Sequence, residues 1–122
     1  IKAVSPLLDS AQLEAARTAA ALMGMNNIYY RFAHMAGGDY GKMPARLRMN
    51  AMRDPGVPRE DFELYSLAVS AINGCELCIS SHERQLREAG MSAEGIQSAA
   101  RIAAVIHAVA RVLESHALPE AA

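Results

Sequence analysis

Long runs of alanine, leucine and methionine, interrupted by short breaks that contain glycine or proline, constrain the fold of this chain most. Asp9 or Ser10 can cap a helix that continues to Met35, because a short side-chain oxygen accepts a bond from an unpaired N–H group at a helix start. The pair Gly37-Gly38 ends this helix. A chain built from such segments is predicted to be helical.

Four further segments have helical character, and each is bounded by proline, glycine or a capping serine: residues 44–52, 59–73, 75–90 and 92–115. No segment has the alternating pattern of a half-buried strand. We therefore predict an all-α fold, a compact bundle of about five helices in one domain over residues 1–122. Because the chain opens at Ile1 and enters a helical pattern at once, we expect it to be the C-terminal part of a longer helical chain.

Charge and composition exclude several classes of partner. The 12 Lys and Arg residues nearly balance the 13 Asp and Glu residues, so no large basic surface for nucleic acid or an anionic membrane is expected. The longest uncharged stretch of the N-terminal part, Thr18 to Tyr30, is too short to span a bilayer. We expect a soluble, cytoplasmic protein that binds neither nucleic acid nor membrane.

The two cysteines stand in one motif, Cys75-Glu-Leu-Cys78, which indicates redox exchange or metal binding rather than a secreted disulfide framework. Cys75 follows Gly74 at a helix start, where exposed N–H groups stabilise a thiolate and bring the pKa of a cysteine into a range of roughly 3.5 to 7.5. Cys78 lies on the same face and can close a reversible disulfide, and His82 lies one turn further along that stripe. An imidazole there can exchange protons with a thiol.

Glu63 is the fourth candidate site residue. It lies in the apolar helix before the motif, where an unpaired carboxylate would be costly to bury. If the two helices pack antiparallel as a redox hairpin over about residues 58–90, Glu63 faces His82 and accepts its proton or orients it. A Glu63 side chain that points into bulk solvent would contradict this hypothesis.

Other interpretations of these residues stay open. The cysteines could be two small buried side chains, or Cys75, Cys78, His82 and Glu63 could complete a tetrahedral zinc shell. Glu63 could also be a partly exposed residue of the first helical turn. The remaining histidines and several methionines are interpreted as packing, surface or subunit-contact residues: His34, His107, His116, Met23, Met25, Met35 and Met43. A thioredoxin fold is excluded as the host of the motif, because it requires flanking strands.

The segments MGMNNIYYRFAHMAGGDY, LRMN and PGVPREDFELYSLAVSAINGCELCISSHE resemble the alkyl hydroperoxide reductase D proteins of the carboxymuconolactone decarboxylase-like superfamily. The resemblance covers most of the chain. Its most specific part is the set of Glu63, Cys75, Cys78 and His82, because the decarboxylase branch is expected to lack the cysteine pair.

The resemblance implies a homotrimer that supports antioxidant defence as a thiol-disulfide oxidoreductase and a lipoyl-dependent peroxidase. Its expected partners are a hydroperoxide, the peroxiredoxin alkyl hydroperoxide reductase C (AhpC) and a dihydrolipoyl protein that donates electrons, with no tightly bound cofactor or metal. Cys78 would form a sulfenic acid, while Cys75, at the more accessible helix start, would donate a proton, resolve the intermediate and exchange with the partner. Glu63 would act as proton acceptor and His82 as proton relay.

One position departs from the resemblance. Some relatives carry a histidine just before the second cysteine, where this chain has Leu77, so a proton relay through that histidine is excluded here. Two rival functions remain: a decarboxylase-like enzyme of the same superfamily, and a zinc-stabilised structural module.

Overall fold

The structure is a computed structural model that describes residues 4–117. Its α-helices are α1 (Ser10–Ala36), α2 (Arg59–Asn73), α3 (Glu76–Glu88) and α4 (Ala93–Ala117). Short 3-10 turns, η1 (Ser5–Leu7), η2 (Tyr40–Lys42) and η3 (Asn50–Met52), lie in the connecting segments. Residues 4–117 contain no strand, so the all-α prediction is confirmed.

Helix α1 begins and ends where the sequence predicts. Asp9 accepts a hydrogen bond from the Gln12 backbone N–H at 2.8 Å, and the Gln12 side chain accepts one from the Asp9 N–H at 3.0 Å. This reciprocal capping box pairs two N–H groups that the helix itself leaves free. At the other end Gly37 has φ +64°, and its N–H donates to the carbonyl of Ala33.

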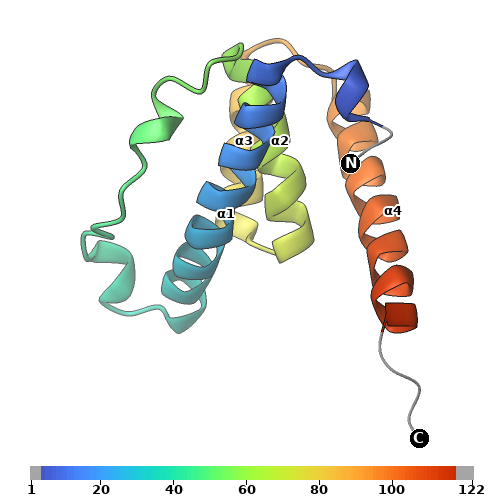
Figure 1. Cartoon of the computed structure of the whole chain (residues 1–122). Helices are drawn as coiled ribbons and strands as arrows, with labels where there is room; N and C mark the ends of the chain where they lie inside the picture. The colour runs from blue at the N-terminus through green and yellow to red at the C-terminus, as the bar shows by residue number, and fades with distance from the viewer. Residues whose placement is uncertain (1–3, 118–122) are drawn as a thin grey trace, which may run out of the picture.

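Helices α1, α2 and α3 pack into one body around two small apolar clusters (Figure 1). Phe62 of α2 is fully buried against Ala15 and Ala19, whose small side chains let α1 and α2 approach closely. Leu67 of α2 and Leu86 of α3 form the second cluster with Ile96 of α4. The second cluster holds the α2–α3 hairpin together at a distance from the cysteine motif, toward the far end of α3.

The prediction of a helix over residues 44–52 is wrong, and the structure has four α-helices in residues 4–117 instead of about five. Only η3 at the end of this segment is helical, and Arg46 has a positive φ of 53°. An isolated stretch of this length is a marginal helix, because nucleation costs more than a few turns return. The chain instead runs as an extended loop beside α1, which Figure 1 shows in green at the outer side of the molecule.

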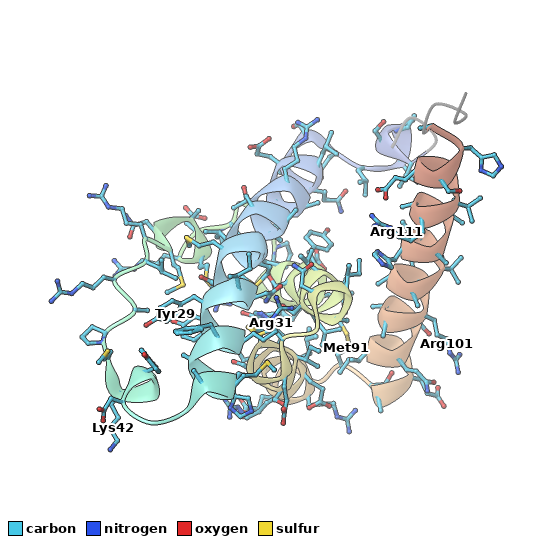
Figure 2. All side chains as sticks on the ribbon, turned by 90° about the horizontal axis from the view of Figure 1, so that it is seen from below. Tyr29, Arg31, Lys42, Met91, Arg101 and Arg111 are labelled. Carbon is cyan, nitrogen blue, oxygen red and sulfur yellow. A yellow bond between two sulfur atoms is a disulfide. The ribbon has the colours of Figure 1, made fainter. Side chains whose placement is uncertain are left out.

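Helix α4 stands apart from the other three helices along most of its length (Figures 1 and 2). Ile96 and Ala103 are its buried residues, whereas six large apolar side chains are about half exposed or more: Ile102, Val105, Ile106, Val109, Val112 and Leu113. By length and composition alone α4 could cross a membrane, but one such helix is only weak evidence for a membrane-spanning segment. Within residues 4–117, no other element covers this apolar face.

Candidate functional site

The corner between α2 and α3 brings the cysteine motif back onto the helix that precedes it. Gly74 adopts the left-handed conformation, with φ +68° and ψ +39°, that ends α2 at little cost only for a residue without a Cβ atom. The Cys75 N–H then donates to the Ser70 carbonyl at 3.2 Å. Arg31 of α1 donates to the carbonyl of Asn73 and fixes the corner from the other side.

Cys75 and Cys78 are joined by a disulfide, with their Cα atoms 5.3 Å apart. Cys75 is the N-cap of α3, and its sulfur accepts the Cys78 N–H at 3.4 Å, so the sulfur lies at the positive end of the helix as the sequence predicts. The expectation that Cys75 is the more accessible thiol is wrong. Cys75 is 0% exposed and Cys78 is 7% exposed. Cys75 is the more buried of the two because its side chain, at the N-cap, turns inward beneath the first turn of α3.

Glu63 and His82 meet across the hairpin as predicted. Glu63 is 2% exposed, and its Oε2 lies 2.6 Å from His82 Nδ1, while its Oε1 accepts a hydrogen bond from Arg59 Nε at 2.9 Å. Burial alone would raise the pKa of Glu63, but the hydrogen bond and charge of His82, with the charge of Arg59, outweigh it and leave the pKa below its ordinary value. The carboxylate is therefore ionised at neutral pH.

A pocket of about 270 Å³ opens beside Cys78. His82, Ser81 and Gln85 line it from α3, Met23, Asn26 and Tyr30 from α1, and Met49 and Met52 from the loop that follows. Leu77, 43% exposed, contributes to the rim, so the position at which a relay histidine is absent supplies apolar surface instead. A small molecule with an apolar part can reach Cys78 here, whereas Cys75 does not line the pocket.

Sequence reasoning missed four buried polar residues around the motif: Asn26, Asn27, Ser66 and Ser70. Asn27 donates to the Ser70 hydroxyl at 2.9 Å and accepts from the Asn73 side chain at 3.0 Å, which ties α1 to the end of α2. The sequence signal for these polar residues is their spacing along the helices. Ser66 and Ser70 follow Glu63 at the i+3 and i+7 places of one helix face, and an asparagine pair interrupts an otherwise apolar stretch of α1.

The three histidines that were predicted to have packing or surface roles lie outside this cluster, whereas Met23 borders it. His34 is half-exposed and 3.4 Å from Glu76, and His107 and His116 are exposed on α4. Met23 is buried as predicted, but its sulfur is 3.3 Å from His82 Nε2, so it also bounds the site. Within residues 4–117 no group of three or more His, Cys, Asp or Glu side chains has the arrangement of a metal site.

The sequence matches the carboxymuconolactone decarboxylase family over residues 38–121, more than half of the chain. The chain belongs to this family. The structure brings together the four residues on which the resemblance rests: Cys75 and Cys78 form a disulfide, and Glu63 contacts His82 across the helical hairpin.

Three curated relatives of the chain carry the name alkyl hydroperoxide reductase AhpD. The relative from Gluconacetobacter diazotrophicus is 60% identical over 111 residues, which cover 91% of this chain and 61% of that protein. The relative from Rhodospirillum centenum is 60% identical over 111 residues (90% and 60%), and that from Bradyrhizobium sp. (strain BTAi1) is 62% identical over 112 residues (91% and 62%). The chain thus spans about three fifths of the length of these relatives.

Proposed function

We propose that this protein is a thiol peroxidase and thiol-disulfide oxidoreductase in which Cys78 reacts with a hydroperoxide and Cys75 closes the disulfide. The proposal rests on the position of Cys78, which borders the pocket together with His82. Cys75 does not line the pocket, and its Cα atom is 5.3 Å from the Cα atom of Cys78. The name shared by the relatives, alkyl hydroperoxide reductase, supports the choice of substrate.

The proposed first step forms a sulfenic acid. The thiolate of Cys78 attacks the terminal oxygen of the hydroperoxide, an S–O bond forms, the O–O bond breaks, and the leaving alkoxide takes a proton to become an alcohol. His82 lines the same pocket and can deliver the proton that Cys78 gave up on ionising. Cys75 then attacks the Cys78 sulfur, its proton and the hydroxyl leave as water, and the disulfide closes.

Glu63 serves this chemistry by holding the histidine. A carboxylate with a lowered pKa is a weak base, so in our proposal the travelling proton resides on His82 rather than on Glu63. The Glu63 contact to Nδ1 leaves Nε2 on the side of Met23 and the pocket. Glu63 therefore accepts the hydrogen bond that orients the relay.

The cycle needs a dithiol that returns two electrons to the Cys75–Cys78 disulfide. We propose a dihydrolipoyl protein as the donor and the peroxiredoxin AhpC as a protein partner whose own disulfide is reduced in exchange. Exposure favours Cys78 as the sulfur that forms the mixed disulfide with either partner, since Cys75 is fully buried. No tightly bound cofactor or metal enters the cycle. A pair that must alternate between thiol and disulfide suits the reducing cytoplasm, where we place the protein.

We further propose that the protein is a homotrimer and that α4 supplies its contacts. The six exposed apolar side chains of α4 recur at helical spacing on one face, and a contiguous exposed apolar face of this kind marks an interaction site. Replacing Ile106 (62% exposed) with Lys is expected to lower the mass in sedimentation velocity, while Gln97→Lys on the same helix leaves it unchanged. An unchanged mass for both variants, or a monomeric wild type, would exclude α4 as the contact.

The activity is tested by peroxide consumption with dihydrolipoamide as donor, measured together with the number of free thiols. Wild type is expected to cycle between two thiols and none while it consumes peroxide, and Cys75→Ser or Cys78→Ser is expected to stop turnover. Absence of both oxidation and turnover would reject the proposal. A lactone or carboxylate-processing activity that survives replacement of both cysteines would favour the decarboxylase-like alternative.

A further inference from the structure

Ser66 carries a buried hydroxyl with no hydrogen-bond partner, on the face of α2 that also carries Glu63 and Ser70. It is 0% exposed, and its Oγ makes no hydrogen bond, although the neighbouring polar groups of the same helix face are paired. Glu63 is bound by His82 and Arg59, and Ser70 accepts a bond from Asn27. A buried donor without an acceptor is costly, and in native structures such a group calls for an explanation such as a redox or catalytic role.

The register of the hairpin shows what lies opposite Ser66. Glu63 contacts His82 at one end, and the Cys75 N–H bonds the Ser70 carbonyl at the other. Between these two fixed points each helix advances by seven positions in opposite directions, about 10 Å.

Ser66 and Cys78 occupy matching levels between those points. Ser66 lies three positions beyond Glu63, and Cys78 lies four positions before His82, so the two levels differ by about 1.5 Å, the rise of one residue. The stripes also match, because Glu63, Ser66 and Ser70 have the same i, i+3, i+7 spacing as the motif on α3. The register thus places Ser66 and Cys78 at nearly the same level on facing stripes of α2 and α3.

We propose that the Ser66 hydroxyl donates a hydrogen bond to the Cys78 sulfur once the disulfide is reduced, and so positions and stabilises the Cys78 thiolate. In the oxidised state the Cys78 sulfur is bonded to the Cys75 sulfur, and Ser66 Oγ makes no hydrogen bond. Reduction by a dithiol breaks the S–S bond, transfers two electrons and leaves one thiol and one thiolate, which is a strong acceptor. Ser66 is a positioning residue that favours the reduced state over the oxidised one.

The test measures the Cys78 thiol directly and needs no peroxide. In a Cys75→Ser background, the rate of alkylation by iodoacetamide is followed against pH, with and without Ser66→Ala. Ser66→Ala is expected to raise the apparent pKa of Cys78 by about one to two units, as loss of a hydrogen bond to a charged group requires. Ser70→Ala is the matched control, since it removes a buried hydroxyl that is already paired, and it is expected to shift that pKa by less than about half a unit.

A second measurement separates this role from simple packing. In the chain with both cysteines, Ser66→Ala is expected to leave the melting temperature of the oxidised form unchanged or higher, and to lower that of the reduced form at pH 8. An unchanged Cys78 pKa, or equal shifts of both melting temperatures, would overturn the inference. It rests on Cys78 being the reactive thiol of the proposed function, but the two fail separately: alkylation can depend on Ser66 in a chain without turnover, and turnover can persist without that dependence.

Discussion

The buried contact between Glu63 and His82 predicts a measurable loss of stability on Glu63→Gln. Glutamine keeps the size of the side chain and one carbonyl oxygen, which can still accept from His82, but its NH₂ group then faces the Nε–H of Arg59. One charge-assisted bond is lost and two donors are opposed. Arg59 is 51% exposed, so solvent screens the loss on its side. On the buried His82 side the hydrogen bond is kept but its acceptor loses its charge, and most of the loss of stability comes from there.

The expected loss is about 2–3 kcal/mol at pH 7, from the value of a hydrogen bond to a charged group and the cost of disturbing a buried pair. For a domain of this size that corresponds to a decrease of roughly 8–12 °C in melting temperature. Differential scanning calorimetry of the oxidised protein measures it. Glu60→Gln, exposed in the same helical turn, is the control and is expected to change stability by less than about 0.5 kcal/mol.

The pH dependence gives the same prediction an independent check. The folded-state pKa of Glu63 lies below its unfolded value, so its stabilising contribution is complete above about pH 4.3 and is lost as pH falls through the folded pKa. The difference in melting temperature between wild type and Glu63→Gln should therefore decrease from pH 7 to pH 3. Equal melting temperatures of Glu63→Gln and Glu60→Gln at pH 7 would show that the buried Glu63–His82 contact does not stabilise the fold.

Three further outcomes are expected. Gly74→Ala, at φ +68°, should lower the free energy of unfolding by about 1–2 kcal/mol, measured by thermal unfolding. Gly24→Ala, in open space within α1, should leave it unchanged or raise it by up to about 1 kcal/mol. Equal effects of the two substitutions would exclude a special role for the α2–α3 corner. Asn27→Ala removes two buried hydrogen bonds and should cost about 2–4 kcal/mol in urea unfolding against less than about 0.5 for the exposed Asn50→Ala, and a smaller cost would mean that water replaces the amide. Elemental analysis of reduced protein should find no stoichiometric zinc; one zinc per chain that disappears with Cys75→Ser would support the structural alternative.

Local signals in the sequence were sufficient for most of the fold. Asp9 and Gly37 bound α1, and Gly74 ends α2, because capping and left-handed backbone are decided by neighbouring residues. The segment 44–52 was predicted wrongly for the opposite reason. Its conformation depends on tertiary contacts that no periodicity records, such as the Met49 sulfur that accepts a hydrogen bond from the side chain of Asn26 at 3.1 Å.

The candidate site was predictable in its composition and less so in its depth. A shared stripe on two antiparallel helices was enough to bring Glu63 to His82. The burial of Cys75 was not predictable, since a helix start can face either solvent or a neighbouring helix, and only packing decides which. The unpaired Ser66 was equally hidden, because serine is common on exposed helix faces and its isolation depends on what surrounds it.

In the proposed cycle, peroxide oxidises the Cys78 thiol and Cys75 resolves the resulting sulfenic acid. The most direct test treats reduced Cys75→Ser and Cys78→Ser with one equivalent of an alkyl hydroperoxide, traps sulfenic acid with a dimedone probe, and locates the adduct by mass spectrometry. We expect an adduct on Cys78 in Cys75→Ser, little or none in Cys78→Ser, and an intramolecular disulfide without adduct in wild type. An adduct that forms on Cys75 in Cys78→Ser but not on Cys78 in Cys75→Ser would contradict these roles.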